Sequence, residues 1–327
     1  MRNQFKLNLK LNLILCLYFC IFLTGCSSES IADRVYTQAI GLTTKSEKAG
    51  NSKNPENPGE SGIFTLYTQE FNQDAGKSVT GADIPEVLRL EQAVNGGKVF
   101  TGHTELLCLD GTCTLKQTEN LLLEQGLSPA CKILYTDPAV YFKNPDSTGT
   151  VHMIRMSEQN GLLSSTELST ALAEWQGFRK TALIPMQKES QDYPALVFLH
   201  QDGTCQELSD AAAKGMYWLR RNTESFTMTL ATPDGTQNIF ISSCKLKKTI
   251  KNQVLNYEIT IKTKDSSPEL QGILQKEILR ECHAAVSEMN QAKADVIGMQ
   301  DVLEHENVNS KLDPNIDPEL KLSVIIK

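Results

Sequence analysis

The sequence predicts a multidomain α+β protein in which largely antiparallel sheets are each covered by helices. Two observations predict this class. Short segments with alternating apolar residues, the period of a half-buried strand, recur from residue 35 to the C-terminus. In the last third, three such segments follow one another closely and precede one long amphipathic stripe, which is typical of an antiparallel sheet with a covering helix.

The N-terminus has the pattern of a bacterial lipoprotein signal. Three positively charged residues lie within the first ten, residues 13–23 carry no charge, and the tetrapeptide Leu-Thr-Gly-Cys ends at Cys26. We expect cleavage of residues 1–25 and lipidation of Cys26, because two acyl chains, such as palmitate, hold a protein stably on a membrane. The apolar run is shorter than the roughly 20 residues of a membrane-spanning helix. The alternative is an ordinary cleaved secretory signal with a chance cysteine.

The mature chain is distinctly acidic. Removal of residues 1–25 takes away three positive charges and no negative ones, so the formal net charge moves from −7 to −10. No run of lysine and arginine that could neutralise phosphates remains, which argues against a nucleic-acid partner and against adhesion to anionic lipid by charge alone. About 300 residues suffice for a large core, and this length suggests two or three domains.

Residues 26–145 are expected to form an N-terminal α+β domain. Within it, residues 45–62 are rich in Lys, Glu, Asn, Pro and Gly and nearly free of apolar side chains, which predicts a disordered loop. A helical stripe stops at Gly96-Gly97, a typical helix end. The predicted strands are residues 35–43, 63–71, 98–109 and 130–135, and the predicted helices are residues 82–95 and 118–125.

Residues 146–222 are expected to form a small middle α/β domain, because the turn-rich segment 144–149 marks a boundary. The tetrapeptide Asp-Gly-Thr-Cys occurs at 110–113 and again at 202–205, each time after a strand and before a helix. We interpret the two copies as similar turns, since four residues do not establish a repeat. The predicted helices are residues 165–176 and 209–221, and the predicted strands are residues 181–186 and 195–200.

Residues 223–327 are expected to form a C-terminal α+β domain with an antiparallel sheet and a long helix. The helix begins at Ser266 or Ser267 with Pro268 in its first turn. Its apolar stripe covers the sheet, and the charged residues Lys276, Glu277, Arg280 and Glu281 are assigned to solvated faces. The predicted strands are residues 226–231, 237–246, 254–264 and 320–326, and the stripe consists of Leu270, Leu274, Ile278, Cys282, Ala285 and Met289.

Six cysteines remain after the signal and the anchor. Only Cys108 and Cys113 lie close together, and if Asp110-Gly111 is a two-residue hairpin turn their thiols face each other across strands. A disulfide between them is one reading, and two semi-buried thiols is the other. No metal site is predicted, because no Cys-x-x-Cys pair exists and the adjacent Cys282 and His283 point about 100° apart on a helix.

No catalytic residue and no cofactor is predicted. His103 follows Gly102 inside a predicted strand, where a structural role is the commoner one. The motifs of serine hydrolases and of phosphate-binding loops are absent. Asp110, Asp202 and Asp234 each precede Gly-Thr and are interpreted as turn residues, since calcium needs six or more converging oxygens. The two tryptophans, Trp175 and Trp218, lie on helix stripes and are assigned to the core.

With these elements in place, the chain resembles the Ger(x)C family, the C-subunit lipoproteins of spore germinant receptors, as a divergent member. The similar segments occur in the family's order along the mature chain. They are Asp33-Arg34 with Gln38-Ala39-Ile40-Gly41, then Lys98 to His103, then residues 196–203 with Gly215 and Trp218-Leu219, and finally Lys293 to Gly298. Typical members read Cys-Trp-Asp at the anchor, whereas here Ser27 and five further residues separate Cys26 from Asp33.

The resemblance implies a non-catalytic lipoprotein subunit needed for receptor assembly or signalling in nutrient-triggered spore germination. Its implied partners are the two integral-membrane A and B subunits, and its implied location is the outer face of the spore inner membrane or the cell membrane, held by lipid at Cys26. The rival function is the solute-binding lipoprotein of an importer. That function requires two lobes of parallel strands around a cleft, and the antiparallel pattern of residues 226–264 argues against it.

Overall fold

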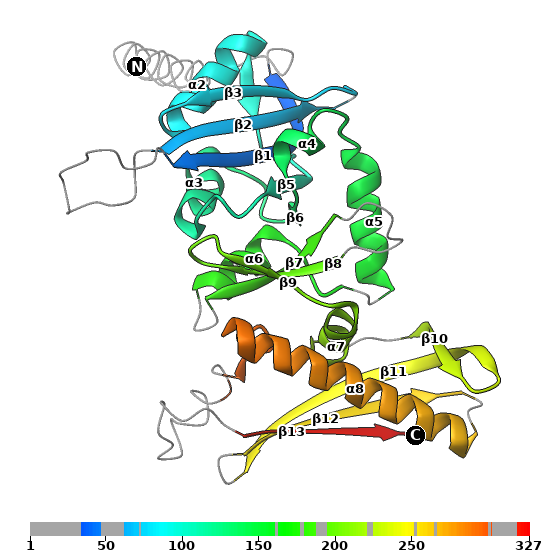
Figure 1. Ribbon diagram of the computed structural model, residues 1–327. Coiled ribbons are helices and arrows are strands. Elements are labelled where there is room, and N and C mark those ends of the chain that lie inside the picture. Colours follow the sequence, from blue (N-terminus) through cyan, green and yellow to red (C-terminus); the bar gives the residue numbers. More distant parts are fainter. Residues whose placement is uncertain are drawn as a thin grey trace, which may run out of the picture.

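A computed structural model of the protein describes most of the chain after the predicted signal (Figure 1). The described residues are 34–46, 62–71, 73–160, 163–176, 180–187, 195–220, 225–251, 254–264, 267–299, 302 and 319–327. Within them the chain forms a nine-stranded sheet and a four-stranded sheet, both covered by helices. The predicted α+β class is confirmed. The predicted signal 1–25 and Cys26 lie outside the described residues.

The nine-stranded sheet is mixed, with parallel strands at its centre. Its longest strand, β1, pairs antiparallel with β2, and β2 pairs antiparallel with β3. On its other side β1 is followed by the parallel strands β5, β6 and β7, and the antiparallel strands β8 and β9 close that edge, while β4 runs parallel to the start of β1. The bounds are β1 Arg34–Ser46, β2 Gly62–Glu70, β3 Lys77–Gly81, β4 Lys98–Phe100, β5 Leu106–Leu109, β6 Lys132–Tyr135, β7 Thr181–Met186, β8 Ala195–His200 and β9 Cys205–Glu207.

Helices cover both faces of this sheet because its central strands are apolar on both sides. On β1, Ile40 and Leu42 face a core shared with three helices, whereas Ala39 faces the opposite core. The first core holds side chains of α2 (Ile84–Asn95), α3 (Leu115–Gln125) and α6 (Leu168–Gln176). The second holds side chains of α4 (Pro138–Tyr141), α5 (Ser147–Gln159) and α7 (Asp210–Arg220).

The four-stranded sheet follows α7 in the chain and matches the predicted C-terminal pattern. β10, β11 and β12 are antiparallel neighbours, and β13 inserts parallel to β12 at the far edge. One helix, α8, lies across one face of this sheet (Figure 1), and its buried residues are the predicted stripe residues from Leu274 to Met289 together with Glu281. Ser267 caps α8 by accepting a hydrogen bond from Leu270 N at 3.2 Å. The bounds are β10 Phe226–Thr232, β11 Gly235–Lys251, β12 Val254–Thr263, α8 Pro268–Ala292 and β13 Glu319–Ile326.

Several local predictions were wrong. The predicted strand 98–109 is two strands, β4 and β5, with a turn between them. The turn-rich segment 144–149 begins α5 instead of a linker, because the Asp146 side chain caps the helix by accepting from Gly149 N at 2.9 Å. The predicted loop 45–62 is shorter at both ends, since β1 reaches Ser46 and β2 starts at Gly62, and residues 47–61 lie outside the described residues.

The domain limits at residues 145 and 222 remain a prediction. Strands from both sides of residue 145 join in the nine-stranded sheet, whereas no strand from before residue 222 enters the four-stranded sheet among the described residues.

The two Asp-Gly-Thr-Cys turns lie against each other. In each turn the aspartate accepts hydrogen bonds from the backbone N–H and the hydroxyl of the following threonine, at 2.9 and 2.6 Å for Thr112 and 2.9 and 2.7 Å for Thr204. These bonds lower the pKa of Asp202. Gly111 and Gly203 have φ of +79° and +89°, and a Cβ on Gly111 would lie 2.7 Å from Gly203 O. Both glycines are therefore required by φ and by the close approach of the two turns.

We predict that Gly203→Ala destabilises the protein more than Gly126→Ala. Both glycines have positive φ, but a Cβ at Gly126 meets nothing within 4 Å, whereas one at Gly203 overlaps Gly111 O. Gly126→Ala should lower the free energy of unfolding by about 1 kcal/mol, because alanine is strained at positive φ. Gly203→Ala should lower it by the same amount and by about 1 to 3 kcal/mol more, because the added methyl group is overpacked against the other turn. Urea denaturation measures both. Equal losses for the two variants would show that the turns are not packed together as described.

Candidate functional site

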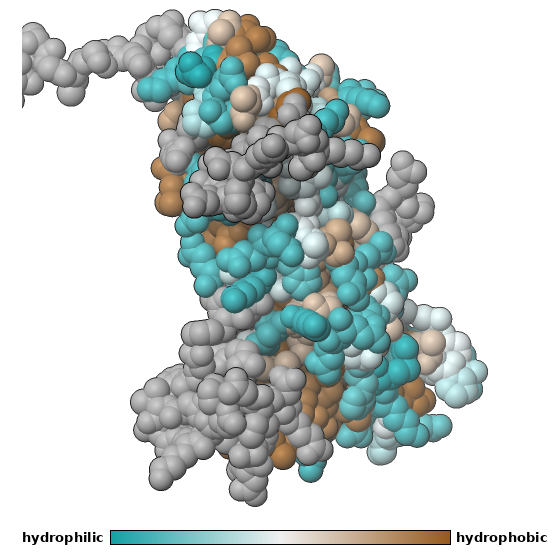
Figure 2. Space-filling model, turned by 60° about the vertical axis from the view of Figure 1, so that its left-hand side comes forward, coloured by the Kyte–Doolittle hydropathy of each residue, from teal (hydrophilic) through white to brown (hydrophobic). Residues whose placement is uncertain are grey.

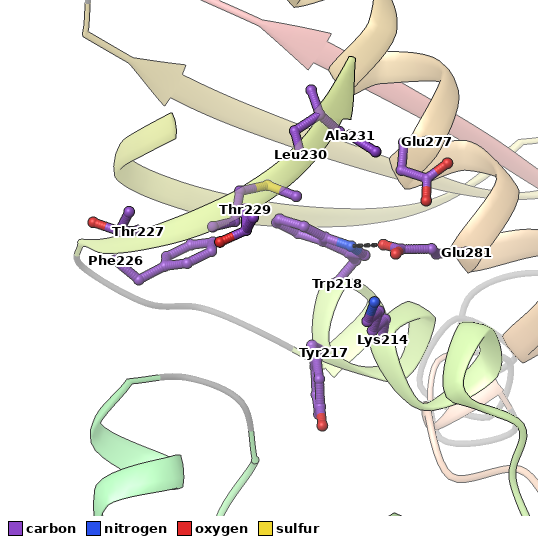
Figure 3. A pocket seen from close by; sticks show the side chains of 11 residues that line it. Lys214, Tyr217, Trp218, Phe226, Thr227, Thr229, Leu230, Ala231, Glu277 and Glu281 are labelled. Carbon is purple, nitrogen blue, oxygen red and sulfur yellow. Dashed lines mark hydrogen bonds between the residues drawn. The ribbon is translucent and has the colours of Figure 1, made fainter. Parts of the chain in front are cut away.

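A pocket of about 420 Å³ lies where α7, α8 and the edge strand β10 meet. Figure 3 shows side chains from all three elements converging on it. Its walls are largely apolar, and charged groups lie on the side of the two helices. The apolar walls include Trp218, Phe226, Met228 and Leu230, and the charged groups are Lys214, Glu277 and Glu281.

The pocket exists because α7 lies unusually close to α8. Gly215 faces the backbone of α8, and a Cβ there would overlap Glu281 O and lie 2.7 Å from the Ala285 methyl. One turn further along α7, Trp218 Nε1 donates a hydrogen bond of 2.8 Å to Glu281 Oε2 (Figure 3). At the start of α7, Ser209 N donates to Glu288 Oε2 at 3.1 Å. These contacts fix α7 along the length of α8.

The same helix also contacts the first sheet. Arg220, at the end of α7, forms an ion pair with Glu174 of α6, and both side chains are largely buried. Glu174 Oε2 also accepts a bond of 3.4 Å from Leu183 N in β7. Breaking a buried pair by removing one partner is costly, because the other charge is left in an apolar environment. α7 is thus held on one side by α6 and on the other by α8, and Figure 1 shows it between the two sheets.

The two carboxylates at the pocket differ in their electrostatics. Burial raises the pKa of Glu281, which is 3% exposed, and the bond from Trp218 offsets this only in part. The hydrogen bond and charge of Arg280 lower the pKa of Glu277, which is more exposed and one turn away. Lys214 favours the ionised form of both. The assignment of Glu281 to a solvated face was wrong, and the spacing 274, 278, 281, 285 of a coiled-coil seam is the signal that places it inward.

Cys108 and Cys113, for which a disulfide and two thiols were the alternatives, are both buried free thiols in the structure. Cys108 lies in β5, and Cys113 lies in the loop before α3, where its Sγ donates to Leu42 O at 3.3 Å. The hairpin that would place them across strands is absent, because β5 pairs in parallel with β1 and β6 instead of turning back. Burial raises the pKa of the Cys113 thiol to about 12 and that of Cys108 well above its usual range. Cys26 lies outside the described residues.

The other singled-out residues make structural contacts. Trp175 Nε1 donates to Leu199 O at 2.7 Å in the core. His103 lies in the turn after β4, not in a strand, and its ring centroid is 6.0 Å from that of Tyr36 and 5.3 Å from that of Phe100. Among the described residues, no three His, Cys, Asp or Glu side chains are grouped as metal ligands would be. The described helices also include none with the length and apolarity of a membrane span.

The last segment of the resemblance, Lys293 to Gly298, ends α8 and anchors the C-terminal sheet. Asp295 Oδ1 accepts from Met299 N at 2.7 Å, and Gly298 has φ of +71°. Between them, Ile297 O accepts from Lys248 Nζ at 2.6 Å and from the Tyr257 hydroxyl at 3.1 Å. This segment therefore joins α8 to β11 and β12.

Comparison with known proteins gives one sequence family and one fold. Residues 195–319, from β8 to the start of β13, match the family described as spore germination B3/GerAC like, C-terminal. A solved structure, described as the crystal structure of the GerBC protein, has a TM-score of 0.50 and 14% sequence identity, with 89% of this chain and 98% of that chain covered. Residues 195–319 therefore belong to the C-terminal domain of this spore germination family, in agreement with the resemblance to the Ger(x)C family. No curated protein matches the sequence.

The matched region includes the whole candidate site. α7, β10 and α8 all lie within residues 195–319, as do Gly215, Trp218 and Glu281. The likeness to the GerBC structure extends over both sheets, since it covers 89% of the chain. The contact between α7 and α8 thus lies within the matched region.

We predict that Glu281→Gln becomes more stable relative to wild type as the pH rises. The pKa of Glu281 is raised in the folded state, so the protonated carboxyl is favoured there, and this contribution is lost as the pH rises through the folded pKa. The amide of glutamine keeps an acceptor for Trp218 without the charge. Urea denaturation of both proteins from pH 4 to pH 8 measures the difference, and a difference that stays constant across this range would contradict the raised pKa.

Proposed function

We propose that this protein is the lipid-anchored, non-catalytic C subunit of a spore germinant receptor. The observation that carries the proposal is the match of residues 195–319 to the spore germination family. The fold shared with the GerBC protein supports it over most of the chain. The protein would contribute to receptor assembly or signalling when nutrients trigger germination, together with integral-membrane A and B subunits.

Anchoring is proposed through Cys26. The sequence before it has the charge pattern and apolar run of a lipoprotein signal. A diacylglyceryl thioether with two acyl chains binds a bilayer stably, whereas a single chain is marginal. The protein would then lie on the outer face of the spore inner membrane or of the cell membrane, beside the integral-membrane subunits.

A role in interaction rather than catalysis is supported by the candidate site. Its polar groups are a buried carboxyl bonded to an indole, a carboxylate paired with Arg280 and the Lys214 ammonium. Among these polar groups there is no nucleophile with a general base within hydrogen-bond distance to activate it. Largely apolar walls with a few polar groups are typical of a binding site. The importer function is disfavoured by the antiparallel pairing of β10, β11 and β12, since its lobes require parallel strands around a cleft.

We predict that Cys26→Ala releases the protein from the membrane and impairs nutrient-triggered germination. The substitution removes the only proposed site of lipid attachment, and without two acyl chains no stable anchor remains. Membrane fractionation and germination of spores with each nutrient measure the two effects.

Cys205→Ser is the matched control. Cys205 is exposed and bonded to the Tyr135 hydroxyl at 2.8 Å, a contact that serine can keep. This variant should stay in the membrane fraction and germinate normally. A Cys26→Ala protein that remains in the membrane fraction, in spores that respond normally to nutrients, would refute the anchoring proposal.

A further inference from the structure

One end of the nine-stranded sheet exposes a group of large apolar side chains. At this end β1 and β4 begin, β2 ends and α2 ends. Val94 of α2 is 64% exposed, and Leu90 of α2 and Phe71 after β2 are 39% and 37% exposed. We call these residues, together with Tyr36, Phe100 and His103, the β1-end patch. Figure 2 shows apolar atoms at the upper end of the molecule, where Figure 1 labels α2.

The members of the β1-end patch from the sheet are contiguous. Tyr36 and Phe100 are register partners on β1 and β4, and their ring centroids are 5.5 Å apart. The His103 ring lies against both. Phe71 N donates to Tyr36 O at 3.2 Å, which places Phe71 beside Tyr36 on the opposite side of β1 from β4. The rings of Tyr36, Phe100 and His103 therefore form one cluster at the start of β1, with Phe71 next to Tyr36 on the neighbouring strand end.

The end of α2 lies next to the same edge. Lys77 Nζ forms an ion pair with Glu70 and also donates to Asn95 Oδ1 at 2.6 Å. Glu70 directly precedes Phe71, and Asn95 directly follows Val94, so this lysine brings the two exposed apolar residues to one end of the sheet. The buried face of α2 is formed by Ile84, Val87, Leu88 and Glu91, which leaves Leu90 and Val94 on its outer face.

The short segment between Cys26 and β1 limits how far this end of the sheet can lie from the membrane. Cys26 precedes Arg34, the first residue of β1, by eight residues, and eight extended residues span at most about 28 Å. If the thiol of Cys26 carries lipid, the start of β1 must stay within that distance of the lipid headgroups. In Figure 1 the four-stranded sheet is at the other end of the molecule. The apolar end is therefore the tethered end.

We propose that the β1-end patch lies in the headgroup region of the membrane that carries the anchor. This inference rests on the proposed lipidation of Cys26 and adds the orientation of the protein on the bilayer. Tyrosine and other aromatic rings are favoured at the interface between lipid and water, because one part of the ring is apolar and the other is polar. Valine, leucine and phenylalanine side chains at the same level gain free energy by leaving water. The tether and the patch would act as two adjacent attachments to one surface.

The test places a tryptophan reporter on the lipidated full chain. The native Trp175 and Trp218 are 2% and 4% exposed, so they contribute little quenchable background. Val94→Trp and Phe71→Trp report on the patch, and Ile325→Trp, at a site 37% exposed on β13, is the matched control. Each protein is purified with its lipid and incorporated into vesicles of phosphatidylcholine and phosphatidylglycerol, in which part of the phosphatidylcholine carries brominated acyl chains.

We expect bromine to quench the added tryptophan at positions 94 and 71 and to leave the one at 325 unchanged. Two patch reporters are used so that a folding defect of one variant does not decide the result. Protein that floats with the vesicles but shows the same quenching at positions 94, 71 and 325 would overturn the proposal and retain the anchor. Protein that fails to float would instead refute the anchoring at Cys26, and the orientation would fall with it.

Discussion

The close contact between α7 and α8 at Gly215 is the constraint on which the arrangement of the two sheets depends. Any side chain at this position would separate the helices, because the space of its Cβ is occupied by Glu281 O. At this separation the Trp218 indole reaches the buried Glu281 carboxyl, while Arg220 at the end of α7 pairs with Glu174 of α6. The pocket is the space left beside this contact by β10.

A buried glutamate in such a contact is costly, since its charged form loses hydration on folding. The structure offsets part of this cost with the indole donor and the nearby Lys214 ammonium. A leucine would pack there at a lower cost, but it would leave the Trp218 N–H without an acceptor in the core. The pair thus makes the helix contact specific: only one rotation of α7 about its axis satisfies both the glycine approach and the indole bond.

The sequence predicted the fold best where elements are local. The C-terminal strands, the start of α8 and its buried stripe depend on periodicity and on a serine and proline at the helix start, and these were correct. Features that depend on contacts between residues far apart in the sequence were harder to predict. The sequence predicted a helix after Asp110-Gly111 but also allowed a hairpin turn there, because the strand that pairs with β5 lies more than sixty residues away in β1. The segment 144–149 contains turn residues, yet Asp146 uses the same side-chain hydrogen bond to begin α5.

For the candidate site, the sequence indicated Gly215 and Trp218 through the family resemblance but assigned Glu281 to solvent. Helical periodicity at 3.6 residues places position 281 near the border of the buried stripe, and burial there depends on how closely the neighbouring helix approaches. That approach is set by Gly215, sixty-six residues earlier. The seam spacing of positions 274, 278, 281 and 285 is consistent with burial of Glu281, but the burial itself is decided by tertiary packing, which a single sequence does not report.

The paired turns at Gly111 and Gly203 have a consequence for how this chain can change over evolutionary time. Each turn is shaped to the other, since the backbone oxygen of either glycine fills the space above its counterpart. Insertions or bulky replacements in one loop can therefore survive only with a matching change in the other. A chimera that takes the Gly111 loop from one relative and the Gly203 loop from another would separate this matched pair. A stable chimera should therefore take both loops from the same parent.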